Sequence, residues 1–211
     1  MSNSDNAIRH RLDLTWVPSM GGPLIVLPVS ALHQWGGCTE DGVMVGGTDQ
    51  LDDYDRACAV EEHAEVISLG DTRTASVLVL GDEPATTCYL AEQRIFLRWL
   101  AADSGPELLA AAEAVLSDPA TPWEKCGVWE TDGPAVLMDS AEAGEDLGVP
   151  YPDGRGKPAE APVPVPAGRW EVRAFHKTGD FPGVGIVQLL AADDGDQPDL
   201  YMEGGESEGG G

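Results

Sequence analysis

The sequence predicts an α+β fold in which the strands of antiparallel sheets outnumber the helices. Short runs of β-branched and aromatic residues recur along the chain, with Gly, Pro and Asp residues between them. Short turns join several consecutive runs, as in β-hairpins, and this favours antiparallel pairing. Only one segment, at about residues 105–117, has the apolar spacing of a helix of several turns.

Most of the predicted strands lie in the first half of the chain. The turn Gly21-Gly22-Pro23 precedes a short β-branched run, which predicts a buried strand. Ser30 is expected to cap a single helical turn over residues 31–35, which Gly36-Gly37 would end. Residues 38–53 are rich in Gly and Asp and are predicted to form a loop. The strands expected before residue 104 cover residues 14–17, 24–27, 54–60, 65–69, 76–80, 86–90 and 94–100.

The helix at 105–117 has clear signals at both ends. Ser104-Gly105-Pro106-Glu107 has the form of a capping box, with Ser as the cap, Pro in the first turn and Glu three residues after the cap. Apolar residues follow at helical spacing in an alanine-rich stretch. Asp118-Pro119 is expected to end the helix.

Strands are predicted again in the second half. Residues 126–130 and 135–138 flank the turn Asp132-Gly133-Pro134, and residues 185–190 form the final strand. Residues 150–168 are rich in Pro and Gly and are expected to form an extended connection. Residues 169–177 alternate, which places Trp170, Val172, Ala174 and His176 on one side of a strand.

The domain organisation follows from these patterns. Residues 1–12 are expected to form a flexible arm, residues 13–191 a single α+β domain, and residues 192–211 a disordered, acidic, Gly-rich tail. The two halves of the domain resemble each other, because Trp16 precedes Gly22-Pro23 as Trp129 precedes Gly133-Pro134. An alternative organisation is therefore two related β-rich lobes, over residues 13–103 and 124–191.

The charge of the chain limits its partners. Twelve basic residues against 37 acidic ones give a formal net charge of −25. Because the chain has so few cations, we expect that it does not bind nucleic acid directly. An anionic membrane surface would repel it for the same reason. A basic protein would be attracted and would associate faster at low salt. The alternative is that the charge only keeps the protein soluble.

Motifs of catalysis and of metal or cofactor binding are absent from the sequence. The four cysteines, Cys38, Cys58, Cys88 and Cys126, include no C-x-x-C pair, and the histidines fit no metal motif. The sequence has no G-x-S-x-G elbow and no P-loop. We therefore expect no enzyme activity, no cofactor and no bound metal. No signal peptide follows Met1, so we expect a cytoplasmic protein with reduced and mostly buried thiols, two disulfides being the alternative.

Two acidic clusters and one tryptophan are the candidates for a partner-binding site. Asp52, Asp53 and Asp55 form the densest acidic cluster within the predicted domain, and a divalent cation is the alternative use of these carboxylates. Asp82 and Glu83 follow a predicted strand, where a general base is the alternative role. Trp35, at the end of a helical turn, is a candidate exposed anchor, and burial in the core is its alternative.

Seven short segments occur in a fixed order along the predicted domain. They are residues 16–23 (WVPSMGGP), 35–37 (WGG), 53–58 (DYDRAC), 81–87 (GDEPATT), 96–99 (FLRW), 136–140 (VLMDS) and 166–170 (PAGRW). With these segments the chain resembles the immunity protein 21 family of bacterial polymorphic toxin systems, over about residues 16–191. The resemblance implies a protein that protects its own cell by binding and neutralising a cognate toxin, and it implies no catalytic residues.

Three functions remain open on the sequence. The first is an immunity protein that occludes the active surface of a toxin, which the charge suggests is a basic, nuclease-type effector. The second is a small metal-dependent hydrolase that uses the acidic loop. The third is an acidic housekeeping interaction protein. For the first function, the predicted partner-binding residues are Trp35, Asp52, Asp53, Asp55, Asp82 and Glu83.

Overall fold

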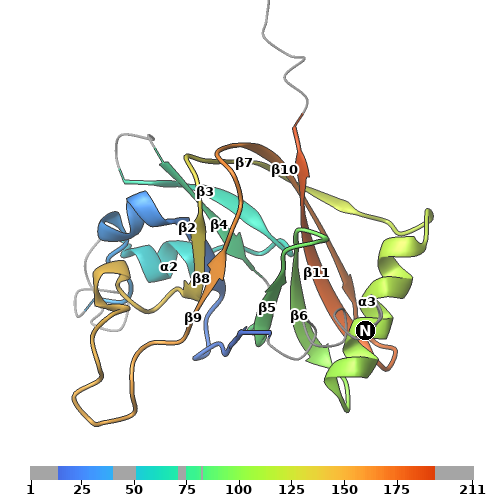
Figure 1. Cartoon of the computed structure of the whole chain (residues 1–211), viewed down its shortest axis with the longest axis horizontal. Coiled ribbons are helices and arrows are strands. Elements are labelled where there is room, and N and C mark those ends of the chain that lie inside the picture. Colours follow the sequence, from blue (N-terminus) through green and yellow to red (C-terminus); the bar gives the residue numbers. More distant parts are fainter. Residues whose placement is uncertain (1–13, 40–50, 71–74, 82, 193–211) are drawn as a thin grey trace, which may run out of the picture.

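Two antiparallel sheets pack face to face in the computed structural model, which describes residues 14–39, 51–70, 75–81 and 83–192 (Figure 1). The six-stranded sheet has the order β1 (Trp16–Val17), β5 (Thr87–Leu90), β6 (Ile95–Ala101), β11 (Gly183–Ala191), β10 (Gly168–Lys177) and β7 (Glu124–Thr131). The five-stranded sheet has the order β3 (Glu65–Leu69), β4 (Ala75–Leu80), β2 (Leu24–Pro28), β8 (Ala135–Asp139) and β9 (Glu160–Val163). The helices are η1 (Val29–Gln34), α2 (Asp53–Cys58), α3 (Gly105–Ser117) and η3 (Gly144–Asp146).

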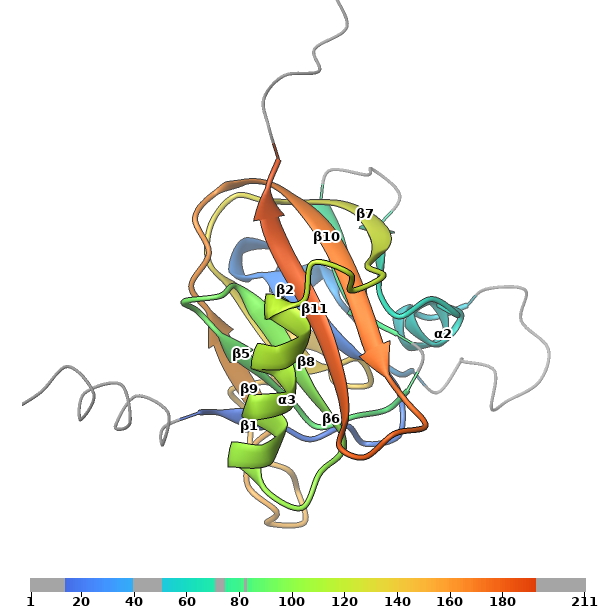
Figure 2. The same ribbon diagram turned by 90° about the vertical axis from the view of Figure 1, so that its right-hand side faces the viewer.

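Helices cover the outer face of each sheet, so the core has three parts. Phe96, Trp129 and Leu137 lie in the central part, between the sheets. The long helix α3 covers β6 and β11 of the six-stranded sheet (Figure 2). The helices η1 and α2 pack against the outer face of the five-stranded sheet. Because both faces of the five-stranded sheet are covered, every residue of β2 and β8 is buried, which explains why these strands read as continuous apolar runs.

The predicted α+β class is confirmed, and most predicted elements are present. The helix α3 starts as expected, because the Ser104 hydroxyl accepts a hydrogen bond from Glu107 N at 3.4 Å. The Glu107 carboxylate accepts instead from the backbone N of Asp103, at 2.8 Å. The alternation of β10 is also confirmed, with Trp170 and His176 both on its buried side.

Three local predictions were wrong. Residues 54–60 were expected to be a strand, but α2 forms there, because Asp52 caps it and Arg56 pairs with Asp53 one turn earlier. No side chain caps η1, and the Ser30 hydroxyl donates to Asp132 instead. The segment 150–168 contains the strand β9, which tolerates its proline because it lies at the edge of a sheet.

The two halves of the chain share both sheets and do not form separate lobes. The order of the six-stranded sheet is symmetric about its centre. From each edge inward, the first half of the chain supplies β1, β5 and β6, and the second half supplies β7, β10 and β11 in the same sequence order. At the centre of the other sheet, β2 pairs with β8. Val29 N donates to Pro134 O at 3.0 Å, and Ser140 N donates to Pro23 O at 3.2 Å. The Gly-Pro turns noted in the sequence thus precede two equivalent strands, while β3 has no counterpart among the described strands.

The predicted terminal segments lie almost entirely outside the described residues. This applies to the arm, 1–12, and to the tail, 192–211, of which only the first residue is described.

Candidate functional site

The structure places Trp35 inside the protein, so the prediction of an exposed anchor was wrong. The side chain is 1% exposed and packs with η1 and α2 against the five-stranded sheet. Its indole N–H donates to the Ser140 carbonyl at 3.0 Å. A buried tryptophan with a satisfied polar atom is part of the core and not of a binding surface.

The first acidic cluster holds α2 in place. The Asp52 carboxylate accepts hydrogen bonds from the backbone N–H groups of Asp55 and Thr39, each at 2.8 Å. Burial acts to raise the pKa of Asp52, but these hydrogen bonds outweigh it and lower the pKa. Asp53 accepts from Gly36 N at 2.8 Å and pairs with Arg56 at 3.0 Å. These two carboxylates tie the helix to the backbone of Gly36 and Thr39, and Asp55 lies half-buried next to them in the sequence.

The second acidic cluster is described only in part. Asp82 lies outside the described residues, whereas Glu83 is exposed in the turn between β4 and β5. The backbone carbonyl of Glu83 accepts a hydrogen bond from the Arg98 guanidinium. Sequence reasoning missed this arginine, because its position on the apolar strand β6 gave no sign of a partner.

Arg98 connects three segments that are far apart in the sequence. Its side chain is 1% exposed, although it carries a charge. Nη1 donates to the carbonyl of Gly81 at 2.7 Å and to that of His63 at 3.4 Å, in addition to the bond to Glu83. One buried guanidinium therefore holds the α2–β3 loop against the β4–β5 turn.

A neutral histidine shares this buried position. His176 Nε2 lies 2.8 Å from Nη1 of Arg98, and since the guanidinium can only donate, Nε2 is the acceptor. Burial, together with the nearby Arg98 and His63, lowers the pKa of His176 to about 3. His63 packs on it with ring centroids 4.1 Å apart, and its Nδ1 lies 3.0 Å from a Glu124 carboxylate oxygen.

Four glutamates lie on the segments next to this buried pair, three of them exposed and Glu124 partly buried, and we call them the acidic surface. Glu61 and Glu62 lie in the loop after α2, and the Glu62 backbone is in close contact with Gly81. The contacts of Arg98 and His63 bring Glu83 and Glu124 to the same place. The acidic surface thus comprises Glu61, Glu62, Glu83 and Glu124. Of the predicted residues that the structure describes, only Glu83 belongs to it. The helix α2 and its cap, which carry the three aspartates, lead into the loop that carries Glu61 and Glu62.

An exposed aromatic residue lies at a hollow beside the acidic surface. The hollow has a volume of about 450 Å³, and Glu83, Trp99 and Phe181 are among the residues that line it. Phe181 is 59% exposed, in the turn between β10 and β11. It offers the large apolar contact that the sequence analysis had assigned to Trp35.

The described residues can also be compared with the sequence predictions on metal ions, membranes and cysteines. They contain no group of three or more His, Cys, Asp or Glu side chains placed to hold a metal ion. No helix in them is long and apolar enough to cross a membrane. All four cysteines are described and free, with Cys88 and Cys126 buried. Cys38 and Cys58 are exposed, contrary to the expectation of mostly buried thiols.

The family of the chain follows from a comparison with protein families. The model of immunity protein 21 matches residues 15–181, which is most of the described structure. The chain belongs to the immunity protein 21 family. No curated protein and no solved structure matches it.

Membership of the immunity protein 21 family makes this an immunity protein of toxin systems. The acidic surface and Phe181 both lie within the matched residues, whereas all of β11 and the C-terminal segment follow the match. The family suggests a role in binding rather than in catalysis, which suits a candidate site of glutamates next to a buried structural arginine.

Proposed function

We propose that this immunity protein neutralises a basic, nuclease-type toxin by covering the toxin's active surface with the acidic surface. The observation that supports this most directly is the gathering of four glutamates on the segments that Arg98 and His63 hold together. Because Arg98 holds the backbone of both the loop and the turn, the positions from which these side chains project are set before a partner arrives. Such preorganisation lowers the entropic cost of binding.

The charge of the toxin follows from what a nuclease must bind. An enzyme that holds a phosphate backbone carries lysines and arginines over its active surface. A protein of formal charge −25 attracts such a surface over a distance, which raises the association rate at low salt. Phe181 in its hollow provides the apolar contact that an acidic patch alone lacks.

The first experiment is co-expression with the neighbouring open reading frame, taken as the toxin gene. Growth arrest by that frame alone, relieved by this protein through a stable complex, is the expected result. A frame that causes no arrest, or an arrest that this protein does not relieve, contradicts the proposed function.

The second experiment tests the acidic surface. The variant Glu61→Gln/Glu62→Gln/Glu83→Gln removes three charges with little change of shape. We expect it to bind the toxin at least about tenfold more weakly at low salt, mainly through slower association, and with a smaller dependence on salt. The matched control is Glu92→Gln/Glu145→Gln/Glu160→Gln, which removes three exposed glutamates from other parts of the fold. Equal losses in both variants would show that only the overall charge matters.

Phe181→Ala tests the apolar contact separately. A lost hot-spot side chain speeds dissociation and costs about 2 kcal/mol of binding free energy. Because Phe181 is mostly exposed, the unfolding transition of the free protein is expected to stay close to that of the parent. Unchanged dissociation of the complex would remove Phe181 from the binding surface.

A further inference from the structure

Cations gather on one face of this strongly acidic protein. Lys125 on β7 and Arg169, Arg173 and Lys177 on β10 all point away from the central core, on the outer face of the six-stranded sheet. We call these four residues the basic face. The other outward charges of these two strands are the carboxylates of Glu130 and Glu171, so four cations face two anions there.

The charges of the basic face are only partly balanced within the sheet. Glu130 pairs with Arg169 at 3.0 Å. Lys125 and Arg173, by contrast, are directly opposite each other on neighbouring strands, an arrangement that destabilises a sheet when no anion lies between the two side chains. Arg173 donates to the neutral Gln188 amide oxygen and lies over the Trp123 ring, 4.2 Å from its centroid. The centre of this face therefore suits an anion.

The C-terminal segment of the chain has the composition that such a face binds. Residues 193–211 contain seven acidic residues and no lysine or arginine, and Leu200, Tyr201 and Met202 form an apolar run among them. The aromatic side chains of Trp123 and Phe175, in contact at 6.2 Å between ring centroids, give that run an apolar partner next to Arg173.

The segment also starts at the right place. The last described residue, Ala192, donates its backbone N–H to the carbonyl of Arg169 at 3.0 Å, so the chain leaves the sheet beside one end of the basic face. Nineteen further residues can span up to about 60 Å, about twice the length of β10. The whole face is within reach of the segment, at an effective concentration that a separate molecule does not match.

We propose that the acidic C-terminal segment, residues 193–211, docks across the basic face of β10 and β7. Docking neutralises the cations of the basic face. It keeps that surface from holding nucleic acid or the acidic surface of a second copy. The inference does not depend on the toxin, because it concerns contacts within one chain.

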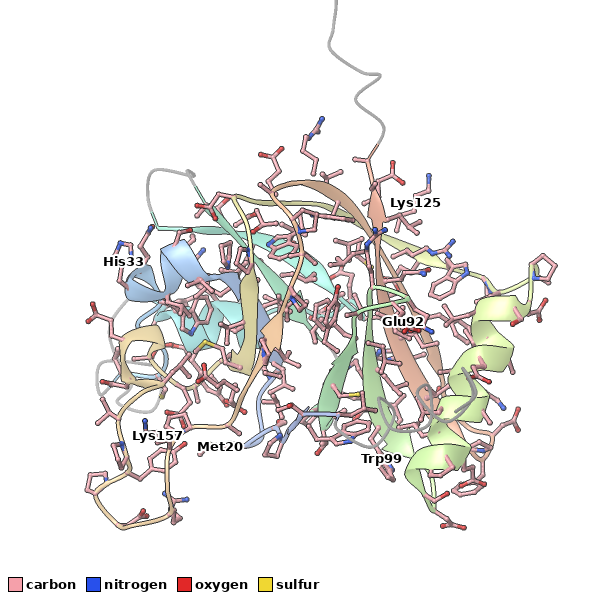
Figure 3. All side chains as sticks on the ribbon, in the orientation of Figure 1. Met20, His33, Glu92, Trp99, Lys125 and Lys157 are labelled. Carbon is pink, nitrogen blue, oxygen red and sulfur yellow. The ribbon has the colours of Figure 1, made fainter. Side chains whose placement is uncertain are left out.

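The chain is suited to a direct test, because it contains only three lysines, Lys125, Lys157 and Lys177. A water-soluble carbodiimide joins a lysine amine to a carboxylate in contact with it, and peptide mass spectrometry identifies the pair. Lys125 and Lys177 belong to the basic face, whereas Lys157 is exposed on the opposite side of the molecule and is the internal control (Figure 3). The full chain is treated with the carbodiimide at two salt concentrations. At about 10 mM the screening length is about 30 Å, and at about 1 M it is about 3 Å.

Cross-links from residues 193–208 to Lys125 or Lys177 are expected at low salt, several times more frequent than those to Lys157 and largely lost at high salt. Equal yields at Lys157, or no cross-links from this segment to the basic face, overturn the proposal. A mixture of isotopically labelled and unlabelled protein shows which copy supplies the carboxylate. Cross-links that join different copies overturn docking within one chain and assign the face to a second copy.

A pair of variants tests the role of the central cation. Arg173→Gln keeps a polar side chain next to Gln188 and removes the charge, and we expect it to lower the yield at Lys125 about threefold to fivefold. Arg155→Gln, which removes an exposed arginine near Lys157, is expected to leave that yield unchanged. Equal yields in the two variants also count against docking on the basic face.

Discussion

Arg98 is the residue on which the geometry of the acidic surface depends. The free energy of unfolding is expected to fall by about 3–5 kcal/mol in Arg98→Met, because the apolar side chain leaves the carbonyls of His63, Gly81 and Glu83 without their buried donor. Arg98→Lys keeps a charge but reaches fewer acceptors, so its loss should be intermediate. Urea denaturation measures both variants. A loss below about 1 kcal/mol in Arg98→Met would show that water replaces the guanidinium at little cost.

His176 makes the stability of the protein depend on pH in a definite direction. Its pKa is about 3 in the folded protein, against about 6.5 for an ordinary histidine. Below pH 6.5 the unfolded chain therefore binds a proton that the folded protein does not. The stability that neutral His176 contributes is complete above pH 6.5 and is lost as the pH falls toward 3, by at most about 1.4 kcal/mol per pH unit.

The variant His176→Gln isolates this effect, because glutamine still accepts a hydrogen bond from Arg98 and does not titrate. Urea denaturation of both proteins at several pH values between 7 and 4 is the measurement. The unfolding free energy of the variant should fall less steeply than that of the parent. If the unfolding free energies of both proteins fell equally with pH, His176 would bind a proton as readily in the folded protein as in the unfolded chain.

At the scale of elements, the contact between the α2–β3 loop and the β4–β5 turn depends on a glycine. A Cβ atom on Gly81 would lie 2.5 Å from the Glu62 carbonyl oxygen and 2.6 Å from Val60 Cγ1. Gly81→Ala is therefore expected to push the two segments apart and to lower the unfolding free energy by about 1–3 kcal/mol. Gly148→Ala is the control, because a Cβ there meets nothing within 4 Å. Similar thermal midpoints for the two variants would contradict the tight contact.

Local signals identified some elements and missed others. The helix α3 was predicted to the residue, because its cap, its proline and its apolar spacing all agree. The short helix α2 was taken for a strand. It is six residues long, too short for helical periodicity to appear, although Asp52 and Asp55 stand at capping positions. The strand β9 was missed because a proline in the sequence argues against a strand, except at an edge.

At the scale of the whole molecule, the formal charge of −25 acts against folding. Mutual repulsion of the carboxylates is weaker in the expanded unfolded chain, so screening should favour the folded state. Raising the concentration of potassium chloride from about 10 to about 150 mM shortens the screening length from about 30 to about 8 Å. We expect the thermal midpoint to rise by a few degrees, as measured by circular dichroism. A midpoint that falls would mean that attractive ion pairs outweigh the repulsion.

The strand order is symmetric between the two halves of the chain, which is a property of the whole molecule. Two similar Gly-Pro turns in the sequence indicated that the halves are related. They did not indicate that the two halves share both sheets. Separate lobes would have left β2 and β8 in different cores. Pairing at the centre instead buries both strands completely and makes the two halves depend on each other for their stability.

The sequence by itself determined most strands, the main helix, the charge and the family resemblance, because apolar spacing, caps and turn residues are local patterns. Only the tertiary structure decided which acidic residues gather, that Trp35 is buried and that Phe181 is exposed. Burial depends on which elements lie next to each other, and strand pairing sets this between residues far apart in the chain. Arg98 reaches His176 across 78 positions because β6 pairs with β11, which pairs with β10. No local pattern in the sequence carries that information.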